Sequence, residues 1–232
     1  MKKGKIKVCY GILLFLFIIS FIWIDPLLAA FFYNFHFPKK FPIINNFLLS
    51  YEKLLHLPSL ILSCFCFCFL FFNRKKRQYF ILKNTLSILL SISSIYLLVF
   101  FVLKPLWNRP RPIETYIYNQ REIFVPFYKI DINSTWSQRN FSSFPSGHAA
   151  TSTSLLSILP VFERYKKKKL YKIFVYLFIP FISIQSLFRM ILGKHFLSDI
   201  FLGIILTYLE IQLINKIIFK KTINKKIMSF DI

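Results

Sequence analysis

The residues of this chain that could do chemistry lie in three short segments, each beside the end of an apolar run. They combine cations, two histidines and one carboxylate. Cations held in place beforehand stabilise the negative charge that spreads over the oxygens of a phosphate during its transfer. An arginine can donate two hydrogen bonds to one phosphate. The set therefore predicts phosphoryl transfer, and its members are Lys104, Arg109, Arg111, Ser146, Gly147, His148, Arg189, His195 and Asp199.

The first segment, residues 104–112, has a proline after each of its two arginines. A residue before proline is driven towards extended conformations, and residues two apart in an extended run share a face. We expect Arg111 to bind phosphate together with Lys104. For Arg109 two alternatives stay open, a second group on the substrate or the headgroups of membrane lipids.

The second segment is Pro145-Ser146-Gly147-His148. Proline and serine start a helix, and the N–H groups of a helix start form an anion site that Gly147, lacking a Cβ, would let a ligand approach closely. An ordinary serine N-cap explains Ser146 equally well. The helix dipole disfavours a cation at this end, so we expect His148 to serve as the proton donor to a leaving oxygen.

The third segment contains Arg189, His195 and Asp199. His195 and Asp199 are four positions apart, which predicts that both lie on one helical face with the carboxylate accepting a proton from one ring nitrogen. The other nitrogen would then be free to attack phosphorus. Gly193 is expected to bend the chain before His195.

Composition indicates the elements that must position these residues. The chain of 232 residues is 56% hydrophobic, with 30 Phe and only five Gly, which is typical of a polytopic membrane protein. A net charge of +22 would suggest nucleic acid in a soluble protein, but cytoplasmic loops of membrane proteins collect Lys and Arg. We therefore predict a single all-α membrane domain over residues 1–232, membrane lipids as its surroundings, and neither a nucleic-acid nor a protein partner.

Most of the 31 Lys and Arg lie at the termini and in the loops around 74–77 and 164–169. The positive-inside rule then places both termini in the cytoplasm and the three segments on the extracytoplasmic side. Residues 26–56 are expected to form an interfacial helix or a plain surface connector, and the outer loop, about 104–145, to shape substrate entry. The six predicted membrane spans are 8–24, 57–73, 79–103, 146–163, 171–188 and 197–219.

Taken together, the three segments follow the pattern K-x6-R-P, then P-S-G-H, then R-x5-H-x3-D over residues 104–199. This pattern resembles that of the type 2 phosphatidic acid phosphatases, the PAP2 superfamily. The family has a serine where this chain has Phe188, so one hydroxyl donor is missing; Ser186 and Ser198 are the candidates to compensate for it, and we expect activity to survive. The residues that carry the resemblance are Lys104, Arg111, Pro145, Ser146, Gly147, His148, Arg189, His195 and Asp199.

The resemblance implies a lipid phosphatase that needs no metal and no cofactor. His195 would attack phosphorus and become phosphohistidine, Asp199 would orient it, and His148 would protonate the leaving group. Lys104, Arg111, Ser146, Gly147 and Arg189 would hold the phosphoryl oxygens.

Two runs, residues 104–112 and 123–127, are further similar to bacterial lipid A 4′-phosphatases. That similarity implies a bacterial inner-membrane enzyme whose site faces the periplasm. Undecaprenyl diphosphate, phosphatidylglycerophosphate and phosphatidate are alternative substrates. A lipid phosphotransferase on the same scaffold is a rival, and a non-catalytic scaffold or transporter a remote one.

Overall fold

The computed structural model describes residues 21–35, 40–43, 46, 49–50, 57–72, 79–130 and 143–228, with 221–228 only as the course of a helix. In this part of the chain the regular structure is helical, apart from one isolated bridge between Thr115 and Glu122. Residues 1–20, which hold most of the predicted first span, lie outside the described residues, as do residues 131–142 of the predicted outer loop.

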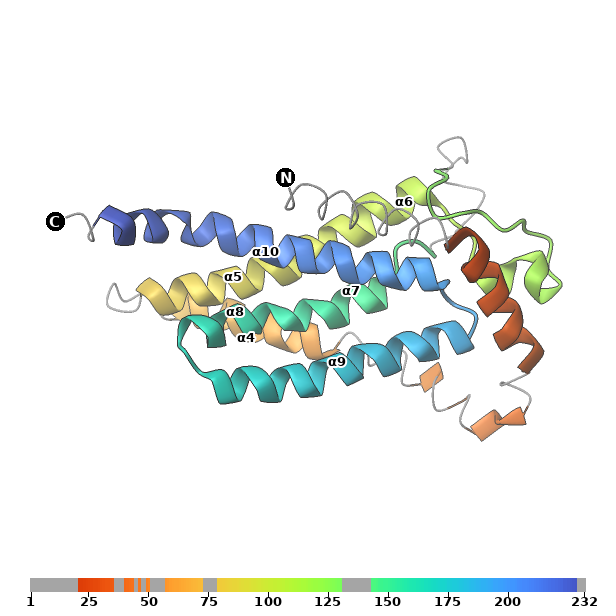
Figure 1. The fold of residues 1–232 in the computed structure, drawn as a ribbon, viewed down its shortest axis with the longest axis horizontal. Coiled ribbons are helices and arrows are strands. Elements are labelled where there is room, and N and C mark those ends of the chain that lie inside the picture. Colours follow the sequence, from red (N-terminus) through yellow and green to blue (C-terminus); the bar gives the residue numbers. More distant parts are fainter. Residues whose placement is uncertain are drawn as a thin grey trace, which may run out of the picture.

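Long helices lie side by side in an elongated bundle (Figure 1). They occupy five of the six predicted spans, and the last two helices run longer than predicted. The elements are α4 (Leu57–Phe72), α5 (Tyr79–Tyr96), η2 (Leu97–Leu103), α6 (Lys104–Trp107), η3 (Pro112–Glu114), η4 (Tyr116–Tyr118), α7 (Gly147–Ser154), η5 (Leu155–Ile158), α8 (Leu159–Arg164), α9 (Lys168–Ile191) and α10 (Leu197–Met228).

Three described segments are long and apolar enough to cross a membrane, namely Tyr79–Glu114, Lys168–Ile191 and Leu197–Lys220. Two shorter apolar helices are Phe21–Phe35 and Leu57–Phe72. Large apolar side chains such as Phe65, Phe72 and Tyr176 are exposed on the outside of the bundle. An apolar exterior is what lipid requires, so the fold is that of a membrane protein. Six spans and cytoplasmic termini stay a prediction.

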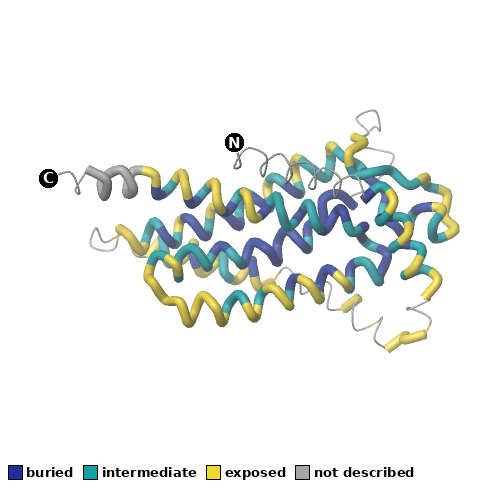
Figure 2. The backbone as a smooth tube through the Cα atoms, viewed as in Figure 1, coloured by how far each residue is buried: buried dark blue, intermediate teal, exposed yellow. Residues whose placement is uncertain are grey.

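The centre of the bundle is α7, whose sequence, GHAATSTS, is small and polar rather than apolar. Seven of its eight residues are buried, and the tube of Figure 2 is accordingly dark along this helix. Its two serine hydroxyls bond back to the helix itself: Ser152 Oγ donates to the carbonyl of His148 at 2.8 Å, and Ser154 Oγ to that of Thr151 at 2.7 Å. Small residues with internally satisfied hydroxyls let neighbouring helices approach closely.

The helix α10 approaches the start of α7 closely. A Cβ added to Gly203 would lie 2.9 Å from the carbonyl oxygen of Ser146. One turn later, Thr207 Oγ1 bonds to the carbonyl of Gly203 at 2.8 Å and reaches that of Ala150 at 3.4 Å. The glycine therefore sets the distance between the two helices whose beginnings hold predicted site residues.

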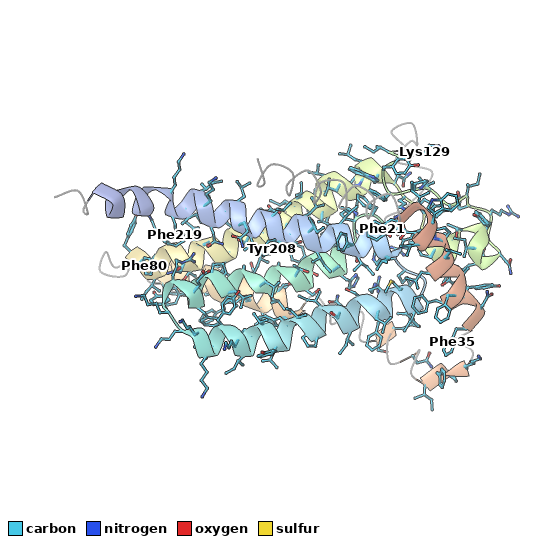
Figure 3. All side chains as sticks on the ribbon, viewed as in Figure 1. Phe21, Phe35, Phe80, Lys129, Tyr208 and Phe219 are labelled. Atoms are coloured by element: carbon cyan, nitrogen blue, oxygen red, sulfur yellow. The ribbon has the colours of Figure 1, made fainter. Side chains whose placement is uncertain are left out.

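At the other end of the bundle a polar cluster ties α5, α8 and α10 together. The guanidinium of Arg164 donates to Asn84 at 2.6 Å and to Asn215 at 2.8 Å, and Ser87 donates to the same Asn215 oxygen at 3.0 Å. Arg164 also lies over the ring of Phe219, 4.0 Å from its centroid. Phe80 and Phe219 mark this end in Figure 3.

The helix over Phe21–Phe35 lies across the opposite end of the bundle rather than along it (red in Figure 1). Phe21, Asp25 and Ala29, spaced by four, are buried against the protein, whereas Trp23 and Leu27 are largely exposed. Phe21, labelled in Figure 3, packs on the rings of two other phenylalanines, Phe127 and Phe201. The predicted end of the first span at residue 24 is therefore not a helix end, because the chain stays helical through Pro26 while its buried face continues.

Replacing Gly203 by Ala tests the α7–α10 contact. Alanine favours a helix interior over glycine by about 1 kcal/mol, yet here its methyl group meets backbone that cannot move aside. We expect the thermal unfolding midpoint of the purified protein to fall. Tyr208→Ala, on the exposed side of the same helix (Figure 3), is the control and should leave the midpoint nearly unchanged. A higher midpoint in Gly203→Ala would contradict the close contact.

Candidate active site

The structure brings the three predicted segments together at the end of the bundle where the Phe21–Phe35 helix lies (Figure 1). The rings of His148, in the first turn of α7, and His195, just before α10, have centroids 6.4 Å apart. The charge of Lys104 interacts with those of Arg111, Arg189 and Asp199. Residues that are up to 95 positions apart thus form one cluster, as the sequence predicts.

Lys104 follows directly on the π-helical turn η2, a rare conformation that often marks functional sites. Its Nζ lies 5.2 Å from the centroid of the Phe100 ring. A Cβ on Gly147 would come within 2.6 Å of Phe100 and 3.4 Å of Lys104 Cε. The glycine is therefore needed first of all for protein packing, because it lets the Phe100 ring and the lysine stem lie against the start of α7.

Ser146 is the N-cap of α7, with its Oγ accepting from the amide of Ala149 at 3.3 Å. Its own N–H donates to the carbonyl of Asp199 at 3.0 Å. Ser146 is therefore an ordinary N-cap, which is the second of the two roles that the sequence allowed. Its amide bonds α7 to α10 and is not available to an anion. The amides of Gly147 and His148 occupy the first helical turn, where the helix offers no acceptor of its own.

The two arginines that the sequence predicts as phosphate ligands, Arg111 and Arg189, come from different parts of the chain. Arg111 is extended, with φ −76° and ψ 155°, as the following proline predicts, and its N–H donates to the carboxylate of Glu114 at 2.7 Å. Arg189 is buried in the last turn of α9. The turn after α9 passes through Gly193 at φ +64°, a left-handed conformation that glycine adopts without strain, and leads directly to His195.

His195 is oriented by a backbone carbonyl rather than by the expected carboxylate. Its Nδ1 lies 2.8 Å from the carbonyl oxygen of Ser143 and 3.8 Å from Asp199 Oδ2. The helix begins only at Leu197, so the four-residue spacing does not place the two side chains on one helical face. Because a carbonyl oxygen can only accept, Nδ1 carries the proton and Nε2 keeps its lone pair.

Asp199 Oδ2 instead caps the start of α10 by accepting the amide of Phe196 at 2.9 Å, and it accepts the hydroxyl of Ser143 at 2.5 Å. The carboxylate therefore reaches the ring of His195 through Ser143 as well as through space. Burial lowers the pKa of His195 to about 4, and Arg189 and Lys104 act in the same direction while Asp199 opposes them. The imidazole is consequently neutral at pH 7, as a nucleophile must be.

Arg109 lies in surroundings that differ from both alternatives drawn from the sequence. Its side chain is fully buried, and Nε donates to the carbonyl of Val125 at 2.7 Å. The guanidinium lies over the ring of Phe196, 4.3 Å from its centroid, and pairs with Asp25 at 2.9 Å and Asp199 at 2.5 Å. Both carboxylates and the ring of Phe196 belong to the protein, so the structure shows the guanidinium engaged by buried protein groups.

Sequence reasoning missed Asp25, Ser143 and the structural use of Ser198. A carboxylate inside an apolar run is costly and signals a partner, and Asp25 carried that signal. Ser198 donates to Asp25 and accepts from Arg109, so its hydroxyl is engaged within the protein. Ser186 is buried on α9 about one turn before Arg189. It is therefore the remaining candidate to supply the hydroxyl that the family has at the position of Phe188.

A cavity of about 190 Å³, counting its open mouth, lies between the Phe21–Phe35 helix and His195. Its walls include Asp25, Phe32, Pro112 and Met190. No three His, Cys, Asp or Glu side chains that could hold a metal ion gather within the described ranges. The cations that interact at the site are Lys104, Arg111 and Arg189.

The chain is similar to one protein family and to a solved membrane protein. No curated protein matches the chain in sequence. Among solved structures, it is similar to a transmembrane PAP2 type phosphatidylglycerolphosphate phosphatase from Bacillus subtilis, with 20% identity, 90% of this chain and 96% of that chain covered, and a TM-score of 0.43. Residues 84–223, more than half of the chain, match the model of the PAP2 superfamily. The chain belongs to the PAP2 superfamily.

Proposed function

We propose that the chain is a membrane lipid phosphatase that works through a phosphohistidine on His195. The observation that carries the proposal is the convergence of His195, in a defined tautomer, with His148 and a group of cations at one end of a membrane bundle. A neutral imidazole, a second imidazole across from it and cations for the phosphoryl oxygens are the parts that the reaction needs.

In the first step Nε2 of His195 attacks phosphorus, and the bond from phosphorus to the lipid oxygen breaks. His148, in its protonated form, gives its proton to that oxygen, so the alcohol leaves uncharged. The new imidazolium carries positive charge on the ring, which the Ser143 carbonyl and the nearby Asp199 carboxylate stabilise. Both are already in place, so the protein does not reorganise during the step.

In the second step a water molecule attacks the phosphorus of the phosphohistidine. His148 now acts as a base and accepts the proton of the water, the bond from phosphorus to nitrogen breaks, and inorganic phosphate leaves. Its oxygens are held throughout by Lys104, Arg111, Arg189, the hydroxyl of Ser146 and the amides of Gly147 and His148. The cations supply the charge stabilisation, and the proposed reaction uses no metal ion or cofactor.

We propose further that the whole chain is one domain with six spans and cytoplasmic termini. In support, the basic connection of residues 164–169 lies at the end of the bundle opposite to the site (Figure 1). Cytoplasmic loops are the ones that carry Lys and Arg. The site would accordingly open on the outer face of a bacterial inner membrane.

The proposed substrate is a lipid phosphate, with the 4′-phosphate of lipid A as the favoured one. The two runs that resemble lipid A 4′-phosphatases pack on each other beside the site: Trp107 Nε1 donates to the carbonyl of Phe127 at 2.5 Å, and the ring of Phe124 lies beside Arg109. This contact supports one surface built jointly by both runs. The alternatives are undecaprenyl diphosphate, phosphatidylglycerophosphate and phosphatidate.

A panel of these four lipid phosphates, presented to the purified full chain in detergent, tests the function. We expect release of inorganic phosphate without any acceptor lipid, the highest kcat/KM on lipid A, and no loss of rate with a chelator. Release only after an acceptor lipid is added would identify a phosphotransferase. No release from any lipid would leave a non-catalytic role, and strict dependence on a divalent metal would refute the mechanism.

The two histidines should respond differently to replacement. His195→Ala should lose turnover and form no alkali-stable phosphoprotein. His148→Ala should lower kcat by ~10²- to 10⁴-fold on a lipid alcohol, the usual range for a general acid. With p-nitrophenyl phosphate, whose leaving group needs no proton, the loss of phosphoprotein formation should be much smaller. Equal losses on both substrates would remove His148 from the acid role, and Ser87→Ala, at the far end of the bundle, controls for folding.

The pH dependence follows from the lowered pKa of His195. Because the neutral form is the nucleophile, activity is kept above the folded-state pKa and lost as the pH falls through about 4. An ordinary histidine would lose half of its activity already near pH 6.5. The measurement is kcat/KM against pH, corrected for the ionisation of the substrate phosphate, which phosphorus NMR titrates separately. A half-loss near 6.5 after this correction would contradict the burial of the nucleophile.

A further inference from the structure

The Phe21–Phe35 helix contributes one carboxylate, that of Asp25, to the interior of the protein. The hydrogen bonds described for this carboxylate are all made with residues beside the candidate active site. Asp25 is 1% exposed. Its Oδ1 accepts the amide of Ser198 at 3.0 Å, and its Oδ2 accepts Nη2 of Arg109 at 2.9 Å and the hydroxyl of Ser198. A buried carboxylate persists only when it is paired and hydrogen-bonded, and here every partner is an immediate neighbour of Asp199.

Arg109 joins Asp25 to Asp199. One arm of its guanidinium donates to each carboxylate, at 2.9 Å and 2.5 Å, while Nη1 also reaches Ser198 Oγ at 2.8 Å. The three charged groups carry a net charge of −1. If Asp25 were neutral, the positive charge of Arg109 would be balanced by Asp199 alone. The negative charge of Asp199 would then be cancelled, because charges interact strongly in the dry interior.

Asp199 in turn holds the nucleophile through Ser143. The Ser143 hydroxyl donates to Asp199 at 2.5 Å, and the Ser143 carbonyl accepts Nδ1–H of His195 at 2.8 Å. The N–H of Ser143 donates to the carbonyl of Arg109 at 3.1 Å, so the backbone of Ser143 is held on both sides, by Arg109 and by His195. A chain of contacts therefore runs from Asp25 to the ring of His195, and both side chains also line the same cavity.

We propose that Asp25 is a positioning residue for the nucleophile: acting through Arg109 and Asp199, it keeps one net negative charge and one fixed geometry behind His195. The proposal rests on the function proposed above. Asp25 touches neither substrate nor the reacting atoms; it preserves the charge that stabilises the imidazolium formed in the first step. The helix that crosses the end of the bundle is thereby part of the catalytic apparatus, although it lies outside residues 84–223.

The test compares Asp25→Asn with Asp25→Glu in the full chain in detergent, using the lipid phosphate that the wild type hydrolyses fastest. Bound vanadate, a phosphate mimic, counts assembled sites, so kcat is expressed per site. We expect Asp25→Asn to lower kcat per site by ~10- to 100-fold, the size typical of a slightly misplaced reacting group, with KM within about twofold. Asp25→Glu, which keeps the charge, should recover most of the loss.

Two controls separate positioning from stability. Ser87→Ala removes a buried hydrogen bond at the far end of the bundle and should keep the wild-type kcat per site. Ser198→Ala removes a hydroxyl that bonds both Asp25 and Arg109 without changing any charge, and should lower kcat severalfold even if Asp25→Asn does not fold. Wild-type kcat per site in Ser198→Ala would then overturn the proposal.

The outcomes also separate this inference from the proposed function. Wild-type kcat per site in Asp25→Asn, or a loss explained entirely by fewer vanadate-binding sites, would overturn the positioning role and leave the phosphatase intact. A loss in Asp25→Asn that Asp25→Glu shares in full would show that the charge is not what matters. A wild type that releases phosphate from no lipid would overturn both.

Discussion

The interaction on which the site depends is the pairing of one buried arginine with two carboxylates. Arg109 lies between Asp25 and Asp199, out of contact with water, and each of the three groups would be too costly to bury alone. Because the partners come from the Phe21–Phe35 helix, the segment after α6 and the start of α10, their pairing fixes three parts of the chain relative to one another. The orientation of His195 follows from that fixed arrangement through Ser143.

The second constraint is steric and lies in α7. This helix can lie at the centre of the bundle because its side chains are small and its two serine hydroxyls bond to its own backbone. Two glycines bring its neighbours close: Gly203 lets α10 touch the carbonyl of Ser146, and Gly147 makes room for Phe100 and Lys104. The distance between the two histidines is a consequence of these contacts, since each imidazole lies at or beside the start of one of the two helices.

The polarity of the molecule is inverted relative to that of a soluble protein. Large aromatic and aliphatic side chains cover the outside of the bundle, and serines, threonines, amides and charges are buried inside it beside apolar clusters around Ile92 and Ile95. The cluster around Arg164 at one end and the cluster around Arg109 at the other hold the helices by hydrogen bonds, which lipid cannot replace. Packing of apolar groups alone would not give the bundle a unique register, because lipid tails solvate such groups equally well.

The sequence by itself determined the helical segments from residue 57 onwards, the grouping of the histidines with Lys104, Arg111 and Arg189, and the bend at Gly193. These features depend on hydropathy runs, on motif spacing and on local backbone preferences, which are properties of neighbouring residues. Only the tertiary structure decided that a carbonyl rather than Asp199 bonds His195, that Arg109 is a buried link rather than a ligand, and that Asp25 belongs to the site. Each of those outcomes depends on which distant groups meet in a dry interior, where every charge must find a partner, and no local pattern encodes that choice.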